Sequence, residues 1–425
     1  MTIARKLIGL CLGAATLPGI AAAQEGAPAV NSGDTAWVLT ATALVLFMSL
    51  PGLALFYGGL VRAKNYLSVL MKIYAIAALA SIVWVFAGYS IAFGTGNGWW
   101  GGLDNLLLKN LGRDAVSGTI PESVFLAFQM TFAIITPGLI VGAFVERVKF
   151  LPVMIFTALW LLIVYAPVTH WIWGGGWLAE MGVIDFAGVL VVHATAGISA
   201  LAYVFMLGKR RGFPHEIAPP HRPAVVMIGA SMLWIGWFGF NGGSVLSADP
   251  ELTSLTLVTT CLAAAAGGVV AALVSFIRYK NLDLTMFLNG ILGGLVGITA
   301  GADVMTPESA IIIGAVAGSL IVFAVSCVDA IRLDDPVGAI AVHLICGIWG
   351  TLAVGIFSTN EEHTFLTQLL GVVCYAAFCL VTSFVIIFTL KKLVGIRVSE
   401  KEELEGLDAH EHGMDAYPDF RLNEH

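Results

Sequence analysis

Most of the chain consists of apolar stretches separated by short polar segments. A helix needs about 20 mainly apolar residues to cross the hydrocarbon core of a bilayer. Eleven stretches meet this requirement, and we predict a transmembrane helix in each. Their approximate bounds are 35–61, 65–93, 122–145, 151–173, 187–207, 223–242, 253–277, 284–301, 308–330, 338–357 and 364–392. Because eleven is odd, the two ends of this bundle are predicted to lie on opposite sides of the membrane.

The first 23 residues have a different pattern. Arg5 and Lys6 precede the apolar run 7–20, and three alanines follow at 21–23. A basic start, a short apolar core and small residues are typical of a secretory signal peptide. We predict cleavage near Ala23, which leaves the mature N-terminus outside the cell; the alternative is one more transmembrane helix.

The basic residues of the loops predict the same orientation. With the N-terminus outside, the loops on the inner side carry eleven Lys and Arg residues, against two on the outer side. Cytoplasmic loops of membrane proteins are enriched in Lys and Arg. The inner set is Arg62, Lys64, Arg147, Lys149, Lys209, Arg210, Arg211, Arg222, Arg278, Lys280 and Arg332, and the outer set is Lys109 and Arg113. The region 24–393 is therefore predicted to be the membrane domain, and 394–425 a cytoplasmic tail.

Composition excludes several classes of protein. Hydrophobic residues make up 58% of the chain and charged residues 12%, too little charge to cover a soluble protein of this length. The net charge of −7 comes partly from the acidic tail, and no basic stripe indicates nucleic-acid binding. The sequence shows no nucleophile–base set, no metal-ligand spacing and no glycine-rich phosphate loop. We therefore expect neither an enzyme nor a metal or other cofactor.

Two segments of the chain resemble each other. In residues 185–198 and 335–348, Asp, Gly, Val, His, Gly and Ile recur at the same positions. A weaker match links 56–59 with 240–243. These pairs fall on predicted helices 5 and 10, and 1 and 6, so each repeat would hold five helices and the second copy would be inverted. In transporters with inverted repeats the site lies between the halves, near the middle of the membrane. Chance similarity in apolar, glycine-rich sequence is the alternative.

The repeat places one histidine, His193 or His343, about eight residues inside each of two helices. A single intramembrane histidine is often an interhelical hydrogen-bonding residue. Two at matching positions favour a transport pathway, since ionisable groups inside bundles usually mark one. Trp173 closes helix 4 and is either an interfacial tryptophan or an aromatic face for a cation. Asp185, at the start of helix 5, has N-capping as its simplest role.

Several other side chains have both a packing interpretation and a functional one. Phe128 and Phe132 lie one turn apart on helix 3, and Phe240 ends helix 6. Such aromatic residues usually pack in a core, but in a pore they form an apolar constriction that excludes hydrated ions. Lys72, near the inner end of helix 2, is predicted to extend its amine to the cytoplasm. We expect Glu146-Arg147, in the next inner loop, to form a structural ion pair or cap.

At this point the chain resembles the Amt/Mep/Rh family of ammonium transporters, in its bacterial branch, over nearly all of its mature length. The matching strings are 51–61, Ala127-Phe128-Gln129, 142–147, 170–176, 185–193, 236–241, 334–343 and 406–417. Together they are specific, although no single string would be.

The resemblance implies roles residue by residue. It implies an outer ammonium site formed by Phe128, Phe132, Trp173 and Ser244 and supported by Asp185. It implies a gate of Phe132 and Phe240, and a narrow pore lined by His193, His343 and Trp237. It further implies a homotrimer and regulation by a PII-type signalling protein that binds the cytoplasmic face together with the tail.

These features predict ammonium transport across the bacterial inner membrane. Ammonium would bind outside, lose its proton near the phenylalanine gate and pass the histidines as ammonia, with or without the proton following. The alternatives are an ammonium sensor that signals through its tail and a channel for another small neutral solute such as urea.

Overall fold

The computed structural model describes residues 29–216 and 218–420. Within these residues, ten helical stretches are long and apolar enough to cross a membrane, and Leu284–Ile298 is a shorter apolar helix. The prediction of an all-α polytopic membrane protein is therefore confirmed, with the eighth predicted span as the shortest. The predicted signal peptide, 1–23, lies outside the described residues.

The first half of the bundle is built largely from helices interrupted by wide π-helical turns. The α-helices are α1 (Ser32–Phe47), α2 (Leu53–Leu60), α3 (Tyr66–Val83), α4 (Tyr89–Phe93), α5 (Glu122–Phe144), α6 (Phe150–Trp160), α7 (Ala166–Ile172), α8 (Trp177–Glu180) and α9 (Thr195–Leu207). The π-helical turns are Met48–Gly52, Trp84–Gly88, Leu161–Tyr165 and Val189–Ala194. Pro51 lies inside the first of these turns, where its missing N–H removes one bond of the regular ladder.

The second half has longer uninterrupted helices and ends in a folded tail. Its α-helices are α10 (Pro223–Gly243), α11 (Pro250–Tyr279), α12 (Leu284–Ile298), α13 (Pro307–Ala330), α14 (Cys346–Phe357), α15 (Phe365–Leu393), α16 (Glu400–Glu405) and α17 (Leu407–His412), with a π-helical turn at Ile340–Ile345. A short hairpin of β1 (Val116–Ser117) and β2 (Ile120–Pro121) precedes α5.

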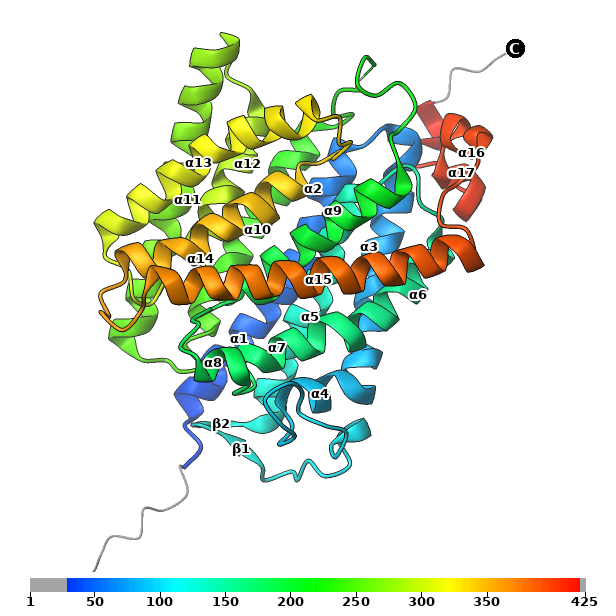
Figure 1. Ribbon diagram of the computed structural model, residues 1–425. Helices are drawn as coiled ribbons and strands as arrows, with labels where there is room; N and C mark the ends of the chain where they lie inside the picture. The colour runs from blue at the N-terminus through cyan, green and yellow to red at the C-terminus, as the bar shows by residue number, and fades with distance from the viewer. Residues whose placement is uncertain (1–28, 217, 421–425) are drawn as a thin grey trace, which may run out of the picture.

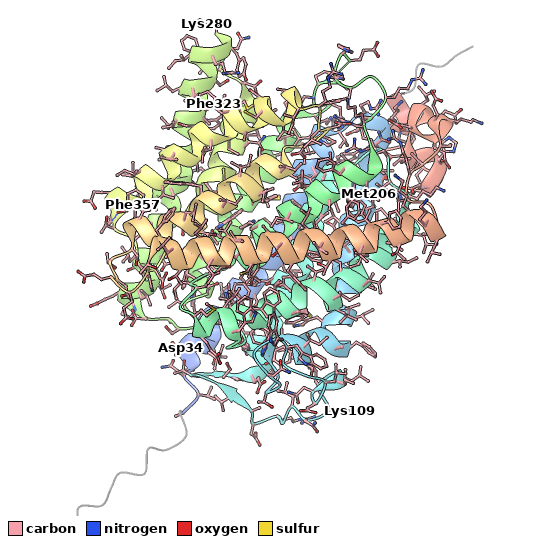
Figure 2. All side chains as sticks on the ribbon, in the orientation of Figure 1. Asp34, Lys109, Met206, Lys280, Phe323 and Phe357 are labelled. Carbon is pink, nitrogen blue, oxygen red and sulfur yellow. The ribbon has the colours of Figure 1, made fainter. Side chains whose placement is uncertain are left out.

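The two ends of the molecule differ (Figure 1). We call the end that carries β1, β2 and the start of α1 the hairpin end. We call the opposite end, which carries α16 and α17, the tail end. The described terminal segments thus lie at opposite ends, as an odd number of crossings requires. In Figure 2, Lys109 lies at the hairpin end and Lys280 at the far side of the molecule.

At the tail end, buried charges are arranged as a network rather than as a local pair. Glu146 and Arg147 do not pair with each other: Glu146 accepts from Arg62 at 2.8 Å, and Arg147 contacts Asp334 at 2.5 Å. Arg210 contacts both carboxylates, at 3.4 and 2.9 Å. The expected ion pair between the two neighbours is not formed; each instead forms a structural ion pair with a residue from a distant loop. Burial works to raise the pKa of Glu146 and Asp334, yet the neighbouring guanidinium groups hold both pKa values below their usual range.

Lys72 corrects one prediction from the sequence. Its side chain does not reach water: it is buried, and its Nζ donates to Ser68 Oγ at 2.6 Å and Glu411 Oε2 at 2.7 Å. Glu411 lies on α17, whose neighbour Asp408 accepts from the backbone N–H of Ser68 at 2.7 Å. The tail therefore covers the start of α3, and the sequence pattern of one helix could not reveal a partner 339 residues away.

Candidate functional site

A sharp turn positions the first histidine. The Asp185 carboxylate accepts from four successive backbone N–H groups, residues 188 to 191, at 2.6–3.0 Å. Gly188 within the turn has φ +108°, and a Cβ there would lie 3.1 Å from the Trp173 ring. Glycine thus permits both the backbone conformation and the close approach of Trp173. The π-helical turn that follows carries His193 into the bundle, and the capping role expected for Asp185 is confirmed.

The second histidine is positioned in nearly the same way. Asp335 accepts from the backbone N–H groups of Ala339 and Ile340, at 3.0 and 2.7 Å. Gly338 has φ +78°, and the π-helical turn Ile340–Ile345 carries His343. The local structure of the two segments therefore agrees with the sequence repeat. The full inverted five-helix repeat stays a prediction.

The two histidines lie face to face in the bundle. Their ring centroids are 5.2 Å apart with planes 10° from parallel, and their exposed fractions are 0% and 5%. Neither nitrogen of His193, nor Nδ1 of His343, has a hydrogen-bond partner among the described residues. His343 Nε2 lies 3.4 Å from Tyr57 Oη. Buried polar atoms without partners are uncommon in proteins, and here they leave the imidazole nitrogens open to a small hydrogen-bonding solute.

Aromatic rings continue from the histidines toward the hairpin end. The Phe240 ring centroid lies 5.7 Å from that of His193 and 4.5 Å from that of Phe132. Phe132 contacts Trp173 edge-to-face at 5.5 Å. The Phe132 and Phe240 planes are inclined at 41° and both rings are buried. The two phenylalanines therefore separate Trp173 from the histidine pair.

Three cavities follow this line of residues. The hairpin-end cavity, about 130 Å³, is lined by Phe93, Phe125, Gln129, Trp173, Phe186, Ser244 and Leu246. The central cavity, about 20 Å³, has both histidines and Trp237 among its lining residues. The tail-end cavity, about 230 Å³, shares Val337 and Gly338 with the central one. The central cavity has room for about one water-sized molecule.

The remaining predicted residues divide into lining and supporting positions. Ser244 lines the hairpin-end cavity while its Oγ donates to the Phe240 carbonyl at 2.8 Å. Trp237 stacks on His193 at 5.3 Å, and its Nε1 donates to Thr299 Oγ1 at 2.8 Å. Phe128 lines none of the three cavities: it is fully buried and packs edge-to-face on Phe132 at 5.0 Å. Phe128 therefore supports Phe132.

The structure adds residues that the sequence did not single out. Phe56 and Tyr57 line the central cavity, and Gln129 lines the hairpin-end cavity. The weaker sequence repeat, which aligns Phe56 with Phe240, was a usable signal for the first of these. Tyr57 and Gln129 lie in strings that carried the family resemblance, but nothing in their spacing distinguishes them from packing residues.

This geometry defines a class: a multi-pass α-helical membrane protein with a narrow internal passage for a small solute. Comparison with known proteins identifies the family. The model of the Ammonium Transporter Family matches residues 36–417. The ammonium transporter of Bacillus subtilis is 39% identical over 406 residues, covering 92% of this chain and 100% of that protein.

Solved structures agree. A protein titled "Sensor Amt Protein" matches with a TM-score of 0.85 at 32% identity, over 89% of this chain and 98% of that one. Mep2 of Saccharomyces cerevisiae matches with a TM-score of 0.82 at 31% identity, over 88% of each chain. The chain belongs to the Ammonium Transporter Family, and the curated relatives it matches are named as transporters.

Proposed function

We propose that this protein conducts ammonium nitrogen through the membrane along the three cavities, from the hairpin end to the tail end. The observation that carries the proposal is the continuous line from Trp173 through Phe132 and Phe240 to the stacked histidines. Each step joins side chains from different helices, so the line exists only in the fold.

Recognition is assigned to the hairpin-end cavity. The Trp173 ring lines this cavity and attracts a cation without a counter-charge, with the buried Phe132 ring packed edge-to-face on it, and the Ser244 oxygen accepts a hydrogen bond. Phe128 holds Phe132 in place, and Asp185 holds the turn on which Trp173 rests. No carboxylate lines this cavity among the described residues. Ammonium would therefore bind reversibly rather than become trapped.

Beyond this cavity the solute must lose its charge. An ion at the centre of a bilayer costs at least about 2.5–3.5 kcal/mol on the lowest scales, and neutral ammonia costs much less. Phe132 and Phe240 form the gate, and ammonium releases its proton on the hairpin side of this gate. His193, His343 and Trp237 then line the passage, where the imidazole nitrogens exchange hydrogen bonds with ammonia.

The setting follows from the sequence. We place the protein in a bacterial inner membrane, with the N-terminus periplasmic after removal of residues 1–23, and the tail 394–425 cytoplasmic. We also propose a homotrimer and a PII-type partner that binds the cytoplasmic face, where the tail is docked on α3.

Radiolabelled methylammonium uptake into proteoliposomes, with and without competing ammonium, tests the function. Saturable uptake that ammonium inhibits is expected. Urea flux without methylammonium flux would favour the neutral-solute channel, and ammonium binding without flux would favour a sensor. Ammonium-evoked current on supported membranes would assign an electrogenic form, whereas ammonia flux without current would assign a neutral one.

A further inference from the structure

The two outer cavities of the pathway differ in chemistry. The hairpin-end cavity is lined by aromatic and aliphatic side chains with Gln129 and Ser244. The tail-end cavity is lined by three carboxylates, Asp329, Asp334 and Asp335, by one guanidinium, Arg210, and by the amide of Asn289. The tail-end cavity thus offers a cation several oxygen ligands, and Phe213 is the one aromatic side chain among the described residues of its lining.

Two of the three carboxylates already have partners. Asp334 contacts Arg147 at 2.5 Å and Arg210 at 2.9 Å, and Asp335 accepts the backbone N–H groups that begin the His343 helix. Asp329 is different. Across residues 29–216 and 218–420, no side-chain hydrogen bond or ion pair reaches the Asp329 carboxylate, although it is half-buried. Arg210 and Asp334 act on it electrostatically without contacting it, so its carboxylate oxygens are open to a ligand.

Asn289 gives the second, independent observation. It lies on α12 with an exposed fraction of 7%, and its Oδ1 is buried with no hydrogen-bond partner in the described part of the chain. Its Nδ2 lies 3.6 Å from the position of a Cβ at Gly338, one of the two residues shared by the central and tail-end cavities. A buried acceptor without a donor is costly, so this amide is placed for a ligand that donates.

We propose that the tail-end cavity is a second binding site for the ammonium ion, which Asn289 Oδ1 and the Asp329 carboxylate hold by accepting its N–H bonds. The proposal rests on the proposed function and extends it to the opposite mouth. Ammonium has four donors and no acceptor, which matches two oxygen acceptors without donor partners. This site sets the affinity of the transporter for ammonium on the tail side, whereas the aromatic cavity sets it on the hairpin side.

The test measures methylammonium entry separately from each side, in membrane vesicles of the two orientations containing the full-length protein. Asn289→Leu and Asp329→Asn should each raise the KM for entry from the tail side about tenfold, the effect of losing one hydrogen bond to a charged group. The KM for entry from the hairpin side should stay within about twofold. Glu308→Gln is the matched control, because Glu308 is exposed in the first turn of α13, at the other end of the helix that carries Asp329.

Each contrary result has a distinct meaning. An unchanged tail-side KM in both variants, or an equal shift on both sides, would overturn the site. Potassium competing from the tail side as well as ammonium would overturn its assignment to ammonium. Wild-type vesicles that transport from neither side would instead refute the proposed function. Asn289→Leu removes an unpartnered buried amide at similar volume, so it should fold normally, and thermal unfolding would verify this.

Discussion

At the scale of single residues, Asp185 shows how much one side chain determines. Its two oxygens accept four backbone N–H groups, which is as many as a carboxylate can take. The same turn supports Trp173, whose Nε1 donates to the Asp185 carbonyl at 2.7 Å. One residue therefore orients both the start of the His193 segment and the indole at the hairpin-end cavity.

We predict that Asp185→Asn lowers both stability and transport. An amide NH₂ would face two of the four backbone N–H groups, so about two charge-assisted hydrogen bonds would be lost, or about 3 kcal/mol. Thermal unfolding in detergent and methylammonium uptake measure the two effects. Asp335→Asn is the control: Asp335 accepts only two N–H groups, so its loss should be about half as large. Equal effects of the two variants would contradict this account.

The histidine pair gives a second prediction at this scale. In His193→Ala, the ring that stacks on Trp237, Phe240 and His343 is removed, and water enters the enlarged central cavity. The free-energy barrier to an ion at the membrane centre, at least about 2.5–3.5 kcal/mol, then becomes lower. The charge carried per ammonia molecule transported should therefore rise by about tenfold. Paired current and flux measurements on reconstituted protein test this.

His215→Ala is the control for the histidine prediction, because His215 is exposed in the loop between α9 and α10. It should leave both current and flux unchanged. If His193→Ala and His343→Ala kept the selectivity and rate of the wild type, the two histidines would be packing residues.

At the scale of elements, hydropathy predicted the helices well and their interruptions not at all. The span predicted at 223–242 is α10, Pro223–Gly243, and that at 364–392 is α15, Phe365–Leu393. A single window of apolar residues determines such a span. The π-helical turns that carry His193 and His343 follow backbone groups capped by an aspartate, and apolar periodicity carries no information about such capping.

The sequence indicated some residues of the candidate site but not others. The repeated histidines indicated a pathway without any knowledge of the fold, and the structure places them face to face. Tyr57 and Asn289 were missed because their importance lies in distances to residues on other helices. The prediction for Lys72 is wrong because its partner, Glu411, comes from the other end of the chain.

The docking of α17 on α3 leads to an element-scale prediction. In Glu411→Ala, the Lys72 ammonium keeps only Ser68 as a hydrogen-bond partner, with Asp408 as a non-contacting negative charge, and a buried charge that loses its paired counter-ion costs several kcal/mol. Release of the tail relieves this cost by admitting water. We therefore expect trypsin to cut at Lys401, whose side chain is 76% exposed, about tenfold faster than in the wild type, since each 1.4 kcal/mol is tenfold.

Two further variants make the tail prediction sharp. In the double variant Lys72→Met with Glu411→Ala, no unpaired charge remains, so cleavage should return toward the wild-type rate. Glu400→Gln removes only the exposed pair with Arg211 and should have little effect, because exposed ion pairs contribute at most about 1 kcal/mol. A double variant that is cut faster than Glu411→Ala would contradict the assigned role of this ion pair.

At the scale of the whole molecule, charge and fold predict one orientation. The tail end carries the ion-pair network of Arg62, Arg147 and Arg210. Lys280 is the C-cap residue of α11, on the far side of the molecule from Lys109 at the hairpin end. Membrane proteins keep their basic loops in the cytoplasm because translocating them is unfavourable. The hairpin end should therefore face the periplasm, and the signal peptide predicted at 1–23 requires the same.

Cysteine accessibility tests this orientation. Lys109 and Lys280 are both exposed, so Lys109→Cys and Lys280→Cys provide one reporter near each end (Figure 2). In spheroplasts, a membrane-impermeant maleimide should label the cysteine at 109 and leave that at 280 unlabelled, and inside-out vesicles should reverse the result. The unmodified chain controls for the native cysteines, of which Cys327 is exposed on α13. Labelling of position 280 in intact spheroplasts would invert the topology, and with it the direction in which the aromatic and carboxylate cavities would serve uptake.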